Sequence, residues 1–327
     1  MQKAENSSTS DTSPPPNRLL LDHQREPLEK LLSVARACFA ISRNSFGIQP
    51  RCNTLIVGPS GSGKSHLARL TAEELGVPIL TVSTADWIPV GCSGRGAVPT
   101  WPMIFNFLDR HHKKEGLVIF LDEVDKIGGD TTWNGYLRNE AFSLLDLRIP
   151  EGIIIDDDQP SKESFEIAQS ALRNRTLLIA AGAFQDIWEQ RSIERIGFGV
   201  SDAKPEATEL SHLTSLIPRE LANRFRADLI VLPQLQRPDY ERMLDRAAEQ
   251  LPPYLRNTFL RLGNKRIAEA LRCRLGCRFA EELLLDTIME ERAQIRSNSV
   301  PATSEEPDCM RKKTEPESKP QQERGGQ

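Results

Sequence analysis

The sequence predicts an α/β fold in which helices flank a parallel sheet and a small α-helical lid domain follows. Short apolar runs alternate with longer segments of helical spacing up to about residue 236. Repeated β-α units of this kind place parallel strands between two layers of helices. From Arg237 onward the short apolar runs stop, and only helical patterns continue.

The expected strands are short apolar runs. The first ends in Leu55-Ile56-Val57, directly before a glycine-rich stretch. Residues 117–121 (Leu-Val-Ile-Phe-Leu) are apolar throughout, which is typical of a parallel strand buried on both faces. In chain order, the expected strands cover residues 53–57, 77–83, 117–121, 176–183 and 228–232.

The expected helices have apolar residues three and four positions apart, which gives each of them one face for burial. In residues 101–112, for example, Ile104, Phe105 and Leu108 fall on one face. In chain order, the expected helices cover residues 28–41, 66–75, 101–112, 137–147, 239–250, 265–275 and 278–296.

Two polar ends enclose the part of the chain that is expected to fold. Residues 1–17 are rich in Ser, Thr and Pro, and residues 297–327 in Lys, Glu, Pro and Gln. Neither composition can bury a core, so both are expected to be disordered tails. Between them we expect a large α/β domain over residues 18–236 and a small α-helical lid domain over residues 237–296.

The composition argues against several classes of protein. The formal net charge of −4 gives no broad attraction to nucleic acid or to an anionic membrane. No apolar run approaches the length of a membrane span, and the polar start lacks the apolar segment of a signal peptide. The 6 cysteines have no framework spacing, so reduced thiols in a cytoplasmic protein are expected.

The glycine-rich stretch after the first strand is a complete phosphate-binding loop. Its residues are Gly58, Pro59, Ser60, Gly61, Ser62, Gly63, Lys64 and Ser65. A strand before it and a helix after it are the context that this motif requires, which disfavours a chance glycine-rich turn. Backbone N–H groups would bind phosphate oxygens, Lys64 would reach the β- and γ-phosphates, and the Ser65 hydroxyl would ligate Mg²⁺. The predicted fold is therefore that of a P-loop NTPase that binds ATP.

An acidic pair ends the strand expected over residues 117–121. Asp122 at the strand end can hold the hydration shell of Mg²⁺, and Glu123 would polarise the attacking water as a general base. Such a pair can also be a solvated strand end, but the upstream loop favours a catalytic role. The pair predicts Mg²⁺-dependent hydrolysis of ATP and not binding alone.

Several segments together resemble the AAA+ ATPases, and most of all the ClpX/HslU branch of protein-unfolding ATPases. The similar segments are Asp122–Ile127, Asn139–Asp146, Leu178–Phe184, Leu216–Phe225 and Gly276–Arg278. Their order along the chain makes the resemblance more specific than any one of them. The resemblance implies a ring, most often a hexamer, that hydrolyses ATP to remodel or unfold a protein partner.

The resemblance also implies roles for two arginines. Arg224 is similar to the arginine finger, which projects from one subunit onto the γ-phosphate held by its neighbour. Arg278 is similar to the sensor arginine of the small domain, which contacts the phosphates within its own subunit. A solvated arginine on a helix surface is the alternative for both.

The chain departs from the family pattern at the loop with which the unfoldases grip polypeptide. Val90-Gly91 is present, but Pro89 stands where the family has an aromatic residue. We expect residues 87–96 to form a partner-gripping loop that exposes Trp87 and Arg95. A tryptophan buried in the core is the alternative. The tripeptide Ile196-Gly197-Phe198 has the letters of a peptidase-docking loop but is too short to carry a prediction.

Two other functions stay open. A DNA-associated ATPase of the loader, replication or mobile-element type would use positive charge such as that of Arg110, Lys113 and Lys114, although the net acidic balance gives no basic face. A nucleotide-gated switch would bind ATP without turnover, and the presence of Glu123 and Arg224 argues against it.

Overall fold

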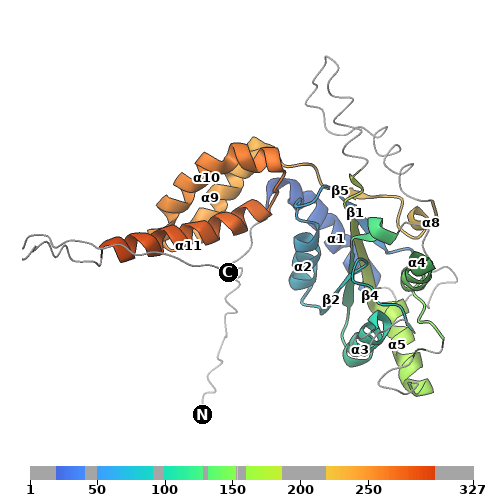
Figure 1. The fold of residues 1–327 in the computed structure, drawn as a ribbon. Helices are drawn as coiled ribbons and strands as arrows, with labels where there is room; N and C mark the ends of the chain where they lie inside the picture. The colour runs from blue at the N-terminus through green and yellow to red at the C-terminus, as the bar shows by residue number, and fades with distance from the viewer. Residues whose placement is uncertain are drawn as a thin grey trace, which may run out of the picture.

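The computed structural model describes residues 20–40, 50–90, 99–127, 132–151, 153, 160–185 and 219–298. Within these ranges a parallel sheet carries helices on both faces, and three further helices stand to one side of it (Figure 1). The predicted α/β fold, with a parallel sheet flanked by helices, is confirmed. None of the helices in these ranges has the length and apolar character that a membrane crossing requires.

The sheet places β1 and β3 so that the chain leaves both strands at the same edge. The strand order is β2-β3-β4-β1-β5, and every pairing is parallel. In a parallel sheet, the loops after the carboxyl ends of the strands meet at one edge, where ligands bind. The strands of the described residues are β1 Thr54–Val57, β2 Ile79–Ser83, β3 Leu117–Asp122, β4 Thr176–Gly182 and β5 Ile230–Val231.

Helices cover both faces of this sheet. One face packs against α1 and α2, whose Leu31 and Leu67 are fully buried. The other face packs against α3, α4 and α5, with Trp101 and Leu144 fully buried between them and the strands. The bounds of these helices are α1 Asp22–Ala40, α2 Lys64–Leu75, α3 Thr100–His111, α4 Thr132–Leu145 and α5 Lys162–Arg175. Two short elements complete this part, the 3₁₀ helix η2 Val124–Ile127 and the helix α8 Arg219–Ala222.

One helix of the sheet region is absent from the sequence prediction. Helix α5 is mostly polar, and its buried side chains are Ala168, Ala171 and Leu172. Small alanines give a weak apolar pattern, so periodicity does not reveal the helix. Its start is nevertheless marked in the sequence, because Ser161 caps it by accepting a hydrogen bond from the Ser164 N–H at 3.1 Å.

The helices to one side of the sheet have a hydrophobic core of their own. They are α9 Arg237–Gln250, α10 Pro253–Cys273 and α11 Arg278–Asn298. Tyr240, Phe259 and Phe279 are each 1% exposed in this core. Helix α10 begins at Pro253, well before the predicted start at residue 265, and its first turns already bury Leu255 and Phe259.

A glycine allows these helices to pack closely. A Cβ on Gly263 of α10 would lie 2.6 Å from a methyl group of Leu244 and 2.9 Å from one of Leu283. The division of the chain into a large domain and a lid domain at residue 237 stays our proposal. The predicted tails lie outside the described residues, except that α11 continues as far as Asn298.

Candidate functional site

The phosphate-binding loop lies between β1 and α2, as its motif requires. Gly61 and Gly63 have left-handed backbones, with φ of 76° and 90°. Glycine adopts such angles without the strain that a side chain would add. A Cβ on Gly58 would lie 2.8 Å from the Ser62 hydroxyl and 2.9 Å from the Leu232 carbonyl oxygen. Three of the glycines predicted from the motif are thus required by the backbone or by its neighbours.

Lys64 begins α2 and folds back over this loop. Its ammonium donates hydrogen bonds to the carbonyl oxygens of Gly58 at 2.8 Å and Pro59 at 2.9 Å. Burial lowers the pKa of Lys64, and the charge of Arg278 acts in the same direction, while Asp122 opposes both. Because an ammonium has three donors, the two bonds fix the position of Lys64 and one donor remains for a phosphate oxygen.

Two oxygen-bearing side chains from different elements meet beside Lys64. The Ser65 hydroxyl on α2 donates a hydrogen bond to Asp122 Oδ2 at the end of β3, at 2.7 Å. The other carboxylate oxygen of Asp122 accepts from the Glu123 N–H at 2.9 Å. A hydroxyl and a carboxylate next to a phosphate site are the ligands that Mg²⁺ takes in such proteins, so the pair fits a magnesium ion.

Glu123 is held in an uncommon backbone conformation at the end of β3. Its φ is 58°, a left-handed value that is rare outside glycine and often found at functional sites. The Ser83 hydroxyl donates to its Oε2 at 3.1 Å, and the Thr84 hydroxyl donates to its backbone carbonyl. Both partners come from the end of β2, where Ser83 pairs with Asp122 in the parallel register.

No sequence motif includes Ser83. Its position beside the acidic pair follows only when β2 is known to neighbour β3, since strand order is not written in the local pattern. A polar residue at the end of a neighbouring parallel strand is the signal that would have revealed it.

The turn between α10 and α11 rests on the phosphate-binding loop. The Cys277 N–H donates to the Gly61 carbonyl oxygen at 2.7 Å. Gly276 in this turn has φ of 62°, and a Cβ on Gly61 would lie 2.6 Å from the Leu275 carbonyl oxygen. Glycines on both sides allow this approach of two backbones, and it brings Arg278, the first residue of α11, near the loop.

A small pocket opens where this turn meets the loop. Its lining includes Ser60, Ser62, Leu235, Tyr240 and Arg274. The Tyr240 hydroxyl accepts from the Gly276 N–H at 2.8 Å, which fixes the turn at one wall of the pocket. The pocket therefore adjoins the phosphate-binding loop.

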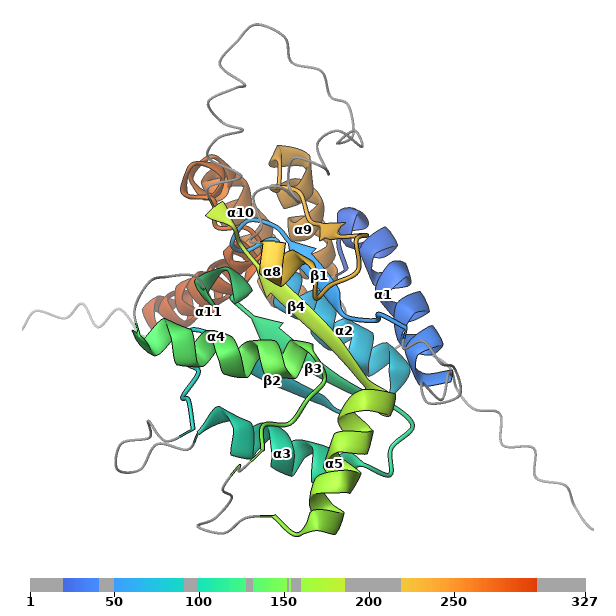
Figure 2. The ribbon, with the colours of Figure 1, turned by 90° about the vertical axis from the view of Figure 1, so that its right-hand side faces the viewer.

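Arg224 is engaged elsewhere on the same subunit. It donates to the two carboxylate oxygens of Asp146 at 3.1 and 3.3 Å and to the Glu220 carbonyl oxygen at 2.6 Å. Its guanidinium also lies 3.9 Å from the ring centroid of Phe142 on α4. Both views place α8 beside α4 (Figure 2). Within the described residues, the hydrogen bonds of Arg224 go to these two partners and not to the phosphate-binding loop.

The prediction that Trp87 is exposed on a gripping loop is wrong. Trp87 is 2% exposed, and its indole N–H donates to the Glu140 carboxylate at 2.9 Å. Its ring lies edge-on to Trp101, with the centroids 6.5 Å apart. Burial of a large ring with its one donor satisfied outweighs exposure to water. Arg95 and the tripeptide at 196–198 lie outside the described residues.

Similarity to known proteins agrees with this geometry. Residues 54–146 match the family described as ATPase family associated with various cellular activities (AAA). The chain is 29% identical over 198 residues to the ATP-dependent Clp protease ATP-binding subunit ClpX of Borrelia duttonii, covering 55% of this chain and 46% of that protein.

The FtsH metalloproteases form a second group of relatives, and the chain covers a smaller share of their length. The chain is 36% identical over 108 residues to the ATP-dependent zinc metalloprotease FtsH of Caulobacter vibrioides, covering 33% of this chain and 16% of FtsH. It is 28% identical over 107 residues to FtsH 1 of a Thermoanaerobacter species, again covering 16% of that protein. The chain thus spans less than half the length of the relatives that it matches.

Proposed function

We propose that this chain, an ATPase whose residues 54–146 form an AAA domain, hydrolyses ATP with Mg²⁺ in a ring of identical subunits to remodel a protein partner. The observation that carries this proposal is the meeting of α2 with β3. The 2.7 Å hydrogen bond from Ser65 to Asp122 joins the two residues that we propose as metal ligands, and Glu123 follows Asp122 directly in the chain. This arrangement supports ATP hydrolysis as the reaction.

Binding of ATP would rest on the phosphate-binding loop. Residues 58–65 would surround the β- and γ-phosphates with backbone N–H groups, and Lys64 would add a positive charge. Ser65 and Asp122 would hold Mg²⁺, which neutralises the charge that develops on the phosphate oxygens. Arg278 would contact the same phosphates from the lid, and so connect the nucleotide to α11.

Hydrolysis would depend on Glu123. Its carboxylate would accept the proton of a water molecule as that water attacks the γ-phosphate. Ser83 and Thr84 hold this residue from the neighbouring strand, so the carboxylate has a defined starting position. We propose Ser83 as a positioning residue for this step.

Assembly into a ring is supported by the place of Arg224. Its partners in its own subunit are Asp146, Glu220 and the ring of Phe142. We propose that Arg224 acts on the γ-phosphate held by a neighbouring subunit, where a guanidinium stabilises the transition state. Six subunits are the number expected from the family that the chain resembles.

The test of this function is the stimulation of ATP hydrolysis. An unfolded protein should raise the turnover of the full chain, and DNA should not. A Glu123→Gln variant should retain the partner in an ATP-bound ring and allow its recovery. Stimulation by DNA alone would favour the loader type of ATPase, and binding of ATP without any turnover would favour a nucleotide-gated switch.

A further inference from the structure

Residues 20–24 pass between the two hydrophobic cores of the described chain. Leu21 is 2% exposed in the core of α9, α10 and α11. Leu28 and Leu31, a few residues later in α1, belong to the core between α1, α2 and the sheet. The start of α1 therefore packs with the lid helices, and the rest of the same helix packs with the sheet.

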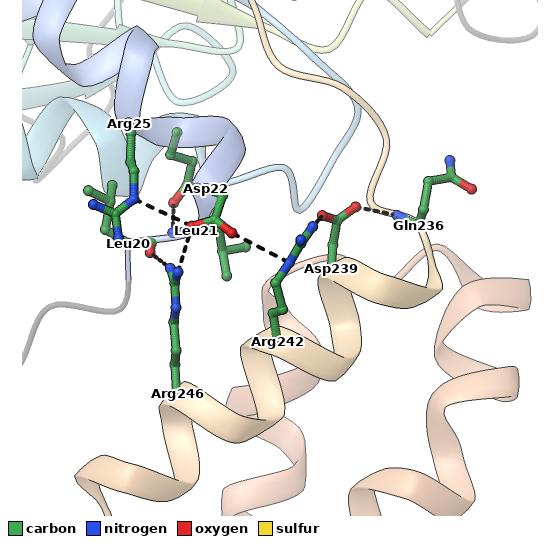
Figure 3. Close-up of polar contacts among 9 residues, drawn as sticks. Leu20, Leu21, Asp22, Arg25, Gln236, Asp239, Arg242 and Arg246 are labelled. Atoms are coloured by element: carbon green, nitrogen blue, oxygen red, sulfur yellow. Dashed lines mark hydrogen bonds and ion pairs between the residues drawn. The ribbon is translucent and has the colours of Figure 1, made fainter. Parts of the chain in front are cut away.

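Asp22 connects this segment to α9. Its carboxylate accepts from Arg246 at 2.5 Å and lies 3.6 Å from the guanidinium of Arg242 (Figure 3). Arg246 also donates to the Leu20 carbonyl oxygen. The hydrogen bond from Arg246 lowers the pKa of Asp22 despite partial desolvation, so the carboxylate is charged at neutral pH. Two arginines of α9 thus hold one end of the segment.

Gln24 connects the same segment to the phosphate-binding loop. It is 1% exposed, and its amide donates to the Ser62 carbonyl oxygen at 3.3 Å. Its side-chain carbonyl oxygen accepts a hydrogen bond from the Leu21 N–H at 3.1 Å. The amide also occupies the space that a Cβ on Gly63 would need. Gln24 therefore attaches the segment to the phosphate-binding loop at a buried position, where its amide packs closely against Gly63.

We propose that residues 20–24 form a strap that holds the lid helices against the phosphate-binding loop, with Asp22 as a positioning residue for nucleotide binding. The lid meets this loop through the Cys277–Gly61 backbone bond, and the strap adds a second attachment through Gln24 to the loop and Asp22 to α9. Two attachments fix an orientation that one hydrogen bond leaves free to rotate. The effect on nucleotide rests on the proposed function, whereas the attachment itself does not.

Two cysteines make the attachment measurable. Cys277 is partly buried where the lid meets the loop, and Cys273, four residues earlier, is exposed. Release of the lid would expose Cys277 and leave Cys273 unchanged. Digestion after Glu269 and Glu281 yields both thiols in one peptide, so fragmentation after iodoacetamide treatment gives the ratio of their labelling directly.

The variant is Asp22→Asn in the full chain, with Glu26→Gln as its control. Asparagine still starts a helix well, so the substitution removes the charge and keeps the start of α1. Glu26 is exposed on the next turn of α1, and its replacement removes the same charge. We expect labelling of Cys277 relative to Cys273 to rise by up to about fivefold in Asp22→Asn, the upper end of the range for an exposed ion pair, and to stay constant in Glu26→Gln.

Arg246→Gln tests the same link from α9. It should raise the ratio as Asp22→Asn does, and the effect of the double variant should be smaller than the two single effects combined, since both remove the Asp22–Arg246 pair. An unchanged ratio in Asp22→Asn and in Arg246→Gln would overturn the strap.

Nucleotide affinity provides the second readout. With Mg²⁺ and a fluorescent ATP analogue, Asp22→Asn should weaken binding by up to about fivefold, the upper end of the same ion-pair range. Faster labelling of Cys277 with unchanged affinity would overturn the positioning role. Binding of the analogue to Lys64→Ala at the affinity of the unmodified chain would contradict the proposed nucleotide site, and the labelling result would still stand.

Discussion

We propose that Lys64 serves ATP binding and Glu123 the chemistry of hydrolysis within one site. Lys64 lies on the phosphate-binding loop through two carbonyl contacts, and Glu123 stands at the end of β3. Lys64→Ala should abolish ATP binding. Glu123→Gln should keep the affinity and lower turnover by about 10²–10⁴-fold, the usual contribution of general base catalysis. Calorimetric titration and phosphate release measure the two quantities, and wild-type turnover in Glu123→Gln would exclude it as the base.

The alkylation rate of Cys277 should depend on pH in a way that reflects the burial of its thiol. Burial, together with the charge of Glu281, raises the pKa of Cys277 from 9.0 to about 11. Since the thiolate is the reactive form, its alkylation should accelerate about tenfold per pH unit up to that value. Between the two values the unfolded chain binds fewer protons than the folded one, so stability should fall as pH rises. A labelling rate that levels off near pH 9 would contradict this pKa.

The chemistry of a residue decided how well the sequence predicted it. Residues 58–65 and Asp122 belong to motifs in which a phosphate and a metal demand fixed residue types at fixed spacing, so a linear pattern reveals them. Ser83 meets Glu123 only because β2 pairs with β3. The residues next to Trp87 in the sequence do not indicate its burial, because its partners Glu140 and Trp101 lie on the helices α4 and α3.

At the scale of elements, the segment after β2 is anchored to α4. Glu140 accepts from the Trp87 indole and from the Val90 N–H at 2.8 Å. Trp87→Ala should destabilise the fold by about 3–5 kcal/mol, the usual cost of emptying a buried aromatic site. Urea unfolding measures this change. Basal and partner-stimulated hydrolysis should fall together, whereas loss of stimulation alone would restore the gripping role.

The contact between the lid turn and the phosphate-binding loop requires glycine for its space as well as its backbone angle. Gly276→Ala would press a methyl group into the backbone of Gly61 and should weaken ATP binding by at least about tenfold. Gly76→Ala is the matched control, since Gly76 has φ of 64° but no atom within 4 Å of its Cβ position. Both variants have the same backbone strain, so equal affinities would show that the contact does not matter for binding.

Periodicity predicted the elements to the extent that they bury apolar residues. Strand β3 is buried along its first five residues, and its prediction as a central strand was correct. Helix α5 buries alanines and Leu172, so local spacing gave no clear pattern for it. The first turns of α10 do bury Leu255 and Phe259, four residues apart, and the prediction missed them.

At the scale of the whole molecule, substitution of Arg224 tests whether neighbouring subunits of a ring share an active site. Arg224→Ala should lower turnover about 10³-fold or more, as the loss of other finger arginines does. Arg219→Ala, at an exposed position on the short helix that precedes Arg224, should have little effect. Mixing Arg224→Ala with Lys64→Ala subunits should restore part of the activity, because each supplies what its neighbour lacks. Mixed subunits that stay inactive, or a monomer with full activity in sedimentation, would exclude the shared site.

The position of β1 in the sheet also determines when its strand pairing can be completed during synthesis. Val57 pairs with Gly182 of β4 and with Val231 of β5, both of which leave the ribosome long after β1. The base of the phosphate-binding loop is fixed at Gly58, whose N–H donates to the Gly182 carbonyl oxygen. A nascent chain therefore exposes an unpaired central strand until β4 arrives, and ATP cannot assist folding before then. The growing chain must be protected from aggregation over this interval without help from its own ligand.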